Sequence, residues 1–177
     1  MEDLINQRYQ IQHLLGQGGF ADTFLAHNQE TGQTCVHKQL SFKKADAWKS
    51  IELFEREAKI LSQLAHPQIP QFMDFFTLET EQDTQIFLVQ EFIAGKNLKQ
   101  WVQSGKHFTE QETIQIALNV VHILEYLHGL APPLIHRDIK PSNLILDHTG
   151  ELHLVDFGAV RDKILQQGQE ASTIIGT

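Results

Sequence analysis

The sequence predicts an α+β fold in which a β-rich first part, residues 1–93, precedes a mostly helical second part, residues 94–177. Before residue 93, short apolar runs alternate with glycine-containing turns, which is typical of antiparallel strands. Further along the chain, apolar residues recur at intervals of three and four, which is typical of helices. Residues 94–97 interrupt both patterns, and we expect them to form a hinge. A junction between two such parts is a common place for a ligand cleft.

Five strands and one helix are expected in the first part. The predicted strands span residues 9–15, 23–27, 34–39, 72–78 and 85–90. A helix is predicted over residues 47–64, because apolar side chains recur there on one face: Ile51, Phe54, Ala58, Leu61 and Leu64. The dipeptide His66-Pro67 then ends this helix, since proline disfavours a helical conformation in the residue before it.

A long helix is the main element expected in the second part. Thr109 and Glu112 have the spacing of a capping box, and the helix is predicted to run to about His128. Its apolar stripe is expected to comprise Ile114, Ala117, Val121, Leu124 and Leu127. Two short strands, residues 144–146 and 152–155, then lead to Asp156.

Composition narrows the class of protein. The 177 residues are enough for one domain with a core, and 41% apolar residues exclude a disordered chain. A net charge of -8 argues against a general nucleic-acid or polybasic membrane partner. Cys35 is the single cysteine, which excludes an internal disulfide and fits a reducing compartment. With no signal peptide and no apolar run of membrane-spanning length, we expect a cytoplasmic protein.

The ten histidines are scattered along the chain. No His-x-x-x-His pair and no set of cysteines has the spacing of a metal site. We therefore interpret most of the histidines as surface or loop residues.

A glycine-rich turn, Gly16, Gln17, Gly18 and Gly19, separates the first two predicted strands. Glycine lets the backbone approach a phosphate group and point its amides toward it. A hairpin with a bulge would have the same composition, so the turn is weak evidence alone. A dinucleotide-binding fingerprint would continue into a helix, whereas this pattern returns to a strand.

Lys38 lies in the third predicted strand, next to apolar residues. Such a lysine is usually a solvated surface charge. It gains a function if a carboxylate on the following helix faces it, and Glu57 is the best candidate, with Glu55 second. A buried Lys–Glu pair would hold the ammonium group where phosphate oxygens arrive.

The most specific stretch is residues 135–147, which is dense in polar groups although apolar residues flank it. Asp138 could accept a proton from an attacking hydroxyl, and Lys140 could neutralise a transferring phosphoryl group. Asn143 and Asp156 offer the oxygen ligands that Mg²⁺ prefers. Phosphoryl transfer requires mainly positioning and compensating charge, which these groups would supply. A polar loop capped by its own side chains is the simpler alternative.

The motifs of this chain together resemble those of the eukaryotic-like (Hanks-type) serine/threonine protein kinases. They are "GQGGFADT", "CVHK", "FEREAKIL", "VQEFIAGKNL", "HRDIKPSN", "DFG" and "GT", and they extend from about residue 9 to residue 177. The resemblance implies a bilobal fold, with residues 1–93 as the N-lobe, a five-stranded sheet plus one helix. Residues 94–177 would be a partial C-lobe with the catalytic loop and the activation segment.

The resemblance also implies a role for each candidate residue. ATP would be bound by Gly16, Gln17, Gly18, Gly19, Ala21, Val36, Lys38, Gln90, Glu91, Ile93 and Ile145. Mg²⁺ would be bound by Asn143 and Asp156. The catalytic set would be Asp138 as the base, Lys140 as the phosphate clamp, and the Lys38–Glu57 pair. An internal stack of Leu61, Phe72, His136 and Phe157 would link the two lobes.

The same resemblance suggests how the protein is regulated, and comparison with the family pattern shows where this sequence departs from it. Arg137 beside Asp138 suggests control by a phosphate on the activation segment, where Ser172 and Thr173 are candidate sites. Thr177 more closely fits the substrate-docking loop. Ala21 replaces the third glycine of the loop, Thr23 replaces a valine, and Val36 replaces an alanine near the adenine.

The family pattern continues beyond the residue at which this chain ends. We expect the chain to be a fragment of a longer kinase or a natural truncation, and exposed apolar surface on the C-lobe would then favour self-association. The expected function is phosphate transfer from ATP to a serine or threonine hydroxyl of a protein substrate. The alternatives are a catalytically weak nucleotide- or partner-binding module and, less favoured, a small-molecule kinase.

Overall fold

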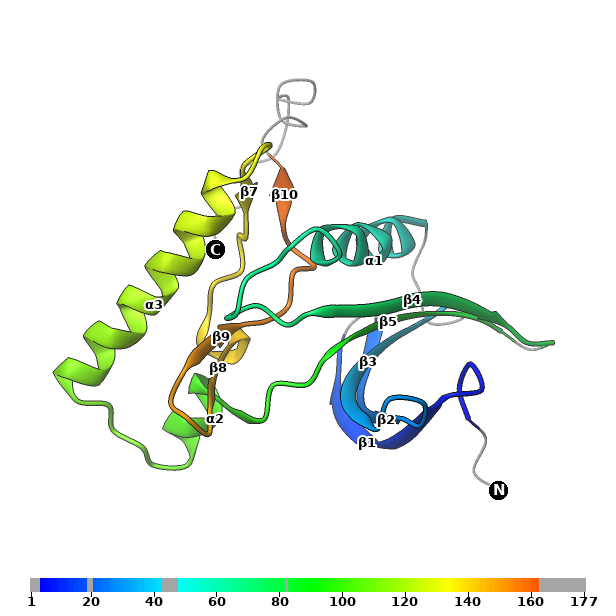
Figure 1. Ribbon diagram of the computed structural model, residues 1–177, viewed down its shortest axis with the longest axis horizontal. Helices are drawn as coiled ribbons and strands as arrows, with labels where there is room; N and C mark the ends of the chain where they lie inside the picture. Colours follow the sequence, from blue (N-terminus) through cyan, green and yellow to red (C-terminus); the bar gives the residue numbers. More distant parts are fainter. Residues whose placement is uncertain (1–3, 19–20, 43–47, 82, 163–177) are drawn as a thin grey trace.

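A computed structural model describes residues 4–18, 21–42, 48–81 and 83–162 of the chain (Figure 1). The first part is a five-stranded sheet with strand order β1-β2-β3-β5-β4, in which all neighbouring strands are antiparallel. Its strands are β1 (Tyr9–Gln17), β2 (Ala21–Asn28), β3 (Gln33–Ser41), β4 (Phe72–Glu79) and β5 (Thr84–Glu91). One helix, α1 (Trp48–Leu61), lies over this sheet on the side toward the second part (Figure 1).

The second part combines helices with short strands. Its helices are α2 (Leu98–Gln103), α3 (Glu110–Gly129) and the 3₁₀ turn η1 (Pro141–Asn143). A three-stranded sheet has the order β6-β8-β9, formed by β6 (Gly95–Asn97), β8 (Leu144–Asp147) and β9 (Leu152–Leu154). A two-stranded sheet pairs β7 (Leu134–Ile135) with β10 (Arg161–Asp162).

One hydrophobic core joins the two parts. It includes Leu40 and Leu88 from the large sheet, Leu61 from α1, Ile123 from α3 and Leu154 from β9, all less than 2% exposed. These side chains come from every layer between the sheet and α3. The position of the sheet relative to the β8–β9 hairpin is therefore set by close packing and not by the covalent link alone.

The side chains of strand β3 alternate between the face toward the second part and the outer face of the sheet. Successive residues of a strand point to opposite faces, so Val36 and Lys38 share the face toward the second part, whereas Cys35 and His37 share the other. Cys35 belongs to a separate cluster on that outer face, with Tyr9, Ala26 and Val89. The imidazole ring of His37 lies 4.4 Å from the ring of Tyr9, between ring centroids.

The predicted hinge over residues 94–97 is wrong in one respect. Most of it forms strand β6, in which Gly95 pairs with Asp147 of β8. A β-carbon at Gly95 would overlap the carbonyl oxygen of Leu146, so only glycine permits this approach. Asn97 then caps α2 with a capping box formed with Gln100. The division of the chain into two domains at residue 93 stays a prediction.

The long helix α3 begins with the predicted capping box of Thr109 and Glu112, but its predicted stripe is mostly wrong. Of the stripe, Ile114 and Val121 are 52% and 56% exposed. Leu124 and Leu127 of the stripe do pack on the core, and the other apolar side chains that do so are Ile116, Val120 and Ile123. The helix is apolar on two faces, and periodicity alone could not select the buried one.

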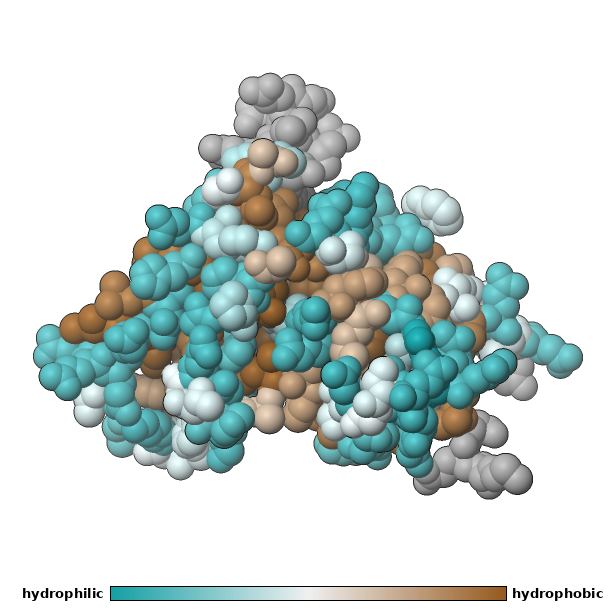
Figure 2. Space-filling view, viewed as in Figure 1, coloured by the Kyte–Doolittle hydropathy of each residue, from teal (hydrophilic) through white to brown (hydrophobic). Residues whose placement is uncertain are grey.

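The outward face of α3 leaves large apolar side chains in solvent. Ile114, Leu118 and Val121 are each at least 47% exposed, and Figure 2 shows apolar surface along the part of the molecule where α3 lies. Self-association through this surface stays a prediction. None of the helices within the described ranges is long and apolar enough to cross a membrane.

Candidate functional site

A cleft of about 540 Å³ lies between the large sheet and the second part. Most of the residues predicted to bind a nucleotide line it: Gly18, Ala21, Val36, Lys38, Gln90, Glu91, Ile93 and Ile145. Glu57, Asp138 and Asp156 also line the cleft. The structure thus brings together, around one space, side chains that are as far apart in the sequence as residues 18 and 156.

Lys38 lies at the centre of the charged end of the cleft. Its ammonium Nζ is 2.5 Å from Oε1 of Glu57 on α1 and 3.1 Å from Oδ1 of Asp156. Of the two glutamates considered, Glu57 is therefore the partner, while Glu55 points to the exposed side of α1. The Lys38 and Glu57 side chains are only 13% and 7% exposed, so this pair is largely desolvated.

The charges of this group stabilise one another. Burial lowers the pKa of Lys38, but the negative charges of Glu57 and Asp156 outweigh burial, and the net pKa is raised. Burial likewise raises the pKa of Asp156, and the ammonium of Lys38 more than compensates, so that this pKa is lowered. Lys38 is therefore positively charged and Asp156 negatively charged at neutral pH.

The two predicted metal ligands flank the open end of the β8–β9 hairpin. Asn143 ends η1 just before β8, and the backbone N–H of Val155, just after β9, donates to the carbonyl of Asn143 at 2.9 Å. Asp156 follows with a left-handed backbone, φ 69°. Such a conformation is uncommon outside glycine and often marks a functional constraint.

The polar loop before β8 is tied together by its own side chains. Nζ of Lys140 donates to Oδ2 of Asp138 at 2.7 Å, which raises the pKa of Lys140. Nδ2 of Asn143 donates to the same Oδ2 and to the backbone carbonyl of Asp138, each at 3.0 Å. Arg137, next to Asp138, has φ 68°. The base, clamp and ligand candidates therefore form one hydrogen-bonded unit.

A buried contact connects this loop to the segment after β9. The rings of His136 and Phe157 meet edge to face, with centroids 5.0 Å apart. Both residues are at most 2% exposed, and Leu61 of α1 belongs to the same core as Phe157, with Phe72 packed against it. The predicted internal stack thus lies within one core.

Some predicted residues lie at the margin of the cleft or outside the described part of the chain. Gly16, Gln17, Lys140 and Asn143 are described but do not line the cleft. Gly19, the candidate phosphorylation sites Ser172 and Thr173, and Thr177 of the predicted substrate-docking loop lie outside the described residues.

At Gly18, a β-carbon would lie 2.7 Å from the carbonyl oxygen of Ala21, so the tight turn between β1 and β2 requires glycine there.

Sequence reasoning missed several apolar residues of the cleft. Leu15, Leu53, Phe54 and Val155 line it together with the predicted residues. Two of them adjoin recognisable motifs, since Leu15 precedes the glycine turn and Val155 precedes Asp156. Their positions next to these motifs were the only signal in the sequence that Leu15 and Val155 line the cleft. Leu53 and Phe54 lie on α1, whose inward face could not be aligned with the cleft from the sequence.

Comparison with known proteins shows which family has this sequence pattern. The protein kinase domain matches residues 9–177. The chain belongs to the protein kinase family. The match covers both the large sheet and the catalytic-loop region, so the whole cleft of this kinase chain lies inside it.

Bacterial serine/threonine kinases are among the similar proteins. The chain is 42% identical to serine/threonine-protein kinase B of Synechocystis sp., over 97% of this chain and 30% of that protein. It is 37% identical to serine/threonine-protein kinase PknA of Nostoc sp., over 99% of this chain and 32% of that protein. The probable serine/threonine-protein kinase YbdM of Bacillus subtilis is 33% identical, over 63% of its length. The kinase chain thus spans about a third of the first two relatives.

Proposed function

We propose that the protein to which this chain belongs is an ATP- and Mg²⁺-dependent serine/threonine protein kinase. The observation that carries the proposal is the position of Lys38, which lies 2.5 Å from Glu57 and 3.1 Å from Asp156 across the cleft. A cation held between two carboxylates at the charged end of an otherwise apolar cleft suits the triphosphate of a nucleotide with a bound metal ion.

The apolar end of the cleft would hold the adenine. Val36 and Ala21 come from the large sheet and Ile145 from β8, and all three line the cleft. Glu91 and Ile93 would offer backbone groups to the base, with Gln90 behind it. The turn of Gly16, Gln17, Gly18 and Gly19 would cover the phosphates, because glycine amides can approach them closely.

The donor set at the other end fits Mg²⁺. Asp156 supplies a carboxylate whose side chain is 46% exposed. Nδ2 of Asn143 makes the bonds to Asp138, so its Oδ1 is an acceptor; it accepts from the hydroxyl of Ser142 at 3.4 Å and keeps a second lone pair for a metal ion. Mg²⁺ prefers hard oxygen ligands and takes few of them from the protein. When bound, the ion would neutralise charge on the transferred phosphate.

The residues of the loop would then act on the substrate hydroxyl. Asp138 would accept the hydroxyl proton as the oxygen attacks the terminal phosphorus of ATP, and the bond from that phosphorus to the β-phosphate oxygen would break to release ADP. Lys140 would turn from Asp138 toward the phosphate and neutralise its developing charge. Lys38 and Glu57 would hold the phosphates in line for the attack. Ordinary general-base catalysis accounts for about 10²–10⁴-fold of the rate.

The substrate class, partners and location are part of the proposal. The relatives are named serine/threonine-protein kinases, so we propose a protein substrate with a serine or threonine hydroxyl. The net charge of -8 argues against a nucleic-acid partner. The single cysteine cannot form an internal disulfide, which fits the proposed cytoplasmic location. Self-association through the exposed face of α3 is proposed as the one further contact.

The proposal is tested by phosphate transfer from labelled ATP to a generic protein substrate, together with nucleotide binding with and without Mg²⁺. Asp138→Asn should lower transfer at least about 100-fold and leave nucleotide binding intact, because Asp138 acts on the hydroxyl. Asp156→Asn should remove the effect of Mg²⁺ on binding. Glu125→Gln, an exposed change on α3, is the matched control.

The alternative, a nucleotide-binding module without transfer, would give Mg²⁺-assisted binding and no transfer by the full-length gene product. Transfer that survives Asp138→Asn unchanged would exclude the assigned base.

A further inference from the structure

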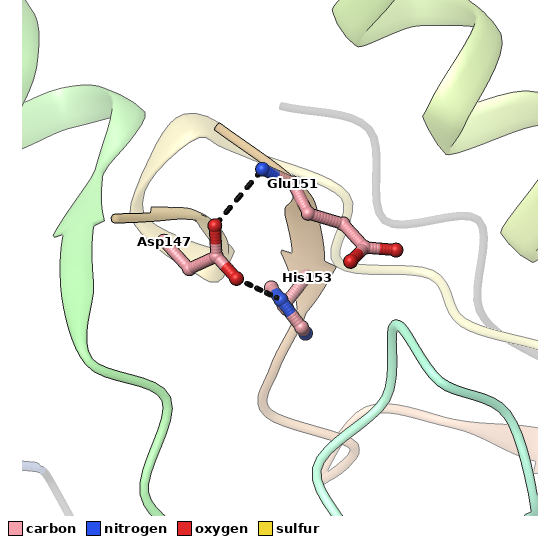
Figure 3. Close-up of side chains that lie close together, drawn as sticks. All are labelled: Asp147, Glu151 and His153. Atoms are coloured by element: carbon pink, nitrogen blue, oxygen red, sulfur yellow. Dashed lines mark hydrogen bonds and ion pairs between the residues drawn. The ribbon is translucent and has the colours of Figure 1, made fainter. Parts of the chain in front are cut away.

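A cluster of three side chains of types that can bind a metal ion lies on the β8–β9 hairpin, outside the cleft lining. Asp147 ends β8, Glu151 follows the turn, and His153 is the middle residue of β9. One ligand atom from each side chain lies within 4.8 Å of the others. Figure 3 shows the three side chains on the hairpin. None of these three residues has a role in the proposed phosphate transfer.

The carboxylate of Asp147 is held in a fixed orientation. Its Oδ1 accepts from the backbone N–H of Thr149 at 2.8 Å, the hydroxyl of Thr149 at 2.7 Å and the backbone N–H of Glu151 at 2.9 Å. These three bonds close the hairpin turn and fully occupy Oδ1. The other oxygen, Oδ2, is left facing Nε2 of His153 at 3.2 Å (Figure 3).

His153 is a buried imidazole without a partner outside this cluster. Its side chain is 9% exposed, and within the described ranges its one hydrogen bond is to Asp147, while Nδ1 has none. A buried polar ring with so little compensation is costly to retain for packing alone. The other ring nitrogen, Nε2, is directed at Oδ2 of Asp147.

The spacing of these atoms suits a shared cation. Two ligands of a tetrahedral ion with bonds of about 2.0–2.1 Å lie about 3.3 Å apart, which is close to the 3.2 Å between Oδ2 of Asp147 and Nε2 of His153. An ion could therefore replace the proton between them without moving either strand. Glu151 is exposed, so rotation of its side chain can bring the third oxygen from within 4.8 Å to bonding distance.

We propose that this hairpin binds Zn²⁺ through Oδ2 of Asp147, Nε2 of His153 and the carboxylate of Glu151, with water in the fourth position. Zn²⁺ binds both imidazole nitrogen and carboxylate oxygen, whereas Mg²⁺ and Ca²⁺ prefer oxygen ligands alone. The hydrogen bonds to Oδ1 of Asp147 supply the outer-shell support that fixes a ligand in place.

The site would fasten the closed end of the hairpin whose open end carries the proposed Mg²⁺ ligands. At that open end Leu144 pairs with Leu154, Asn143 precedes the pair, and Asp156 follows it. The zinc ion would act on the hairpin and not on the transferred phosphate, because it lies at the opposite end of the two strands from the proposed Mg²⁺ ligands. Zinc binding would thus stiffen the element that spaces Asn143 from Asp156.

The test is competition for Zn²⁺ between the full-length protein and a chromophoric chelator, repeated with Co²⁺ to record its visible spectrum. The wild-type protein should show one saturable site and the absorption bands of tetrahedral Co²⁺. Asp147→Asn and Glu151→Gln should each weaken Zn²⁺ binding at least about tenfold and abolish those bands. In Asp147→Asn the amide oxygen can still accept the three turn bonds, so the fold is retained.

The matched control is His148→Asn, which removes an exposed histidine from the same turn. This variant should bind Zn²⁺ as the wild type does. Saturable binding that survives both cluster variants, or that His148→Asn weakens equally, would overturn the assignment, as would the absence of a saturable site. Because no nucleotide is present, these outcomes are independent of whether the protein transfers phosphate.

Discussion

The buried histidine of β3 gives the sharpest prediction. His37 is fully buried among Tyr9, Phe76 and Phe87, and within the described part of the chain neither ring nitrogen has a hydrogen-bond partner. Burial lowers the pKa of His37 from 6.5 to about 4, against a smaller opposing effect of Asp74. We expect His37→Leu, a change of similar volume, to remove one acid-sensitive contribution to stability.

The sign and size follow from proton linkage. Because the pKa of His37 is lower in the folded state than in the unfolded state, the unfolded chain binds the extra proton between about pH 6.5 and pH 4. The stabilising contribution is therefore complete above pH 6.5 and is lost progressively as the pH falls toward 4. At pH 5 the loss relative to pH 7 amounts to about 2 kcal/mol. That is a large share of a typical unfolding free energy of about 5–15 kcal/mol.

The measurement is urea unfolding at pH 7 and pH 5, followed by circular dichroism, for the wild type and for His37→Leu. The difference in unfolding free energy between the two pH values should be about 2 kcal/mol smaller in the variant. His122→Asn, which changes an exposed histidine of α3, should leave that difference as in the wild type. Equal losses in wild type and His37→Leu would refute the reasoning.

Three further changes test the fold around the cleft. Lys38→Met should lower the unfolding free energy by about 3–5 kcal/mol because it leaves buried Glu57 without its partner, and adding Glu57→Leu should restore most of it in denaturant titrations. If the double variant is no more stable than Lys38→Met, the pair is not the cause. Gly95→Ala should lower the melting temperature, since the new methyl group meets the β8 backbone, whereas Gly129→Ala, with open space around it, should not. Thr109→Ala should cost about 1 kcal/mol through loss of the α3 cap, and an unchanged unfolding midpoint would contradict the capping role.

Much of the fold could be predicted because its signals are local. The five strands of the large sheet, helix α1 and the cap of α3 depend on alternation, on three- and four-residue spacing and on a capping box, which neighbouring residues alone determine. Pairing of β6 with β8 could not be predicted, because it depends on a partner some fifty residues along the chain. The buried face of α3 likewise depends on which side of the helix meets the core.

The site could be predicted in outline for a different reason. Residues such as Lys38, Asp138 and Asp156 stand out because charge is costly inside apolar sequence, and they cluster in the cleft. The apolar lining carries no such signal, so Leu53 and Phe54 were missed. The separate zinc ligands proposed on the β8–β9 hairpin could not be predicted either, since Asp147 and His153 are six residues apart across a turn, a spacing outside the usual histidine patterns.

Burial alone does not decide the charge of a side chain in this protein, as the neighbours His37 and Lys38 demonstrate. Both are desolvated on the same strand, yet the pKa of His37 is lowered while that of Lys38 is raised. The period of a strand sends Lys38 toward two carboxylates and His37 toward aromatic rings. Acid should therefore weaken the outer face of the sheet while Lys38 keeps its charge, so loss of stability near pH 5 need not begin in the cleft.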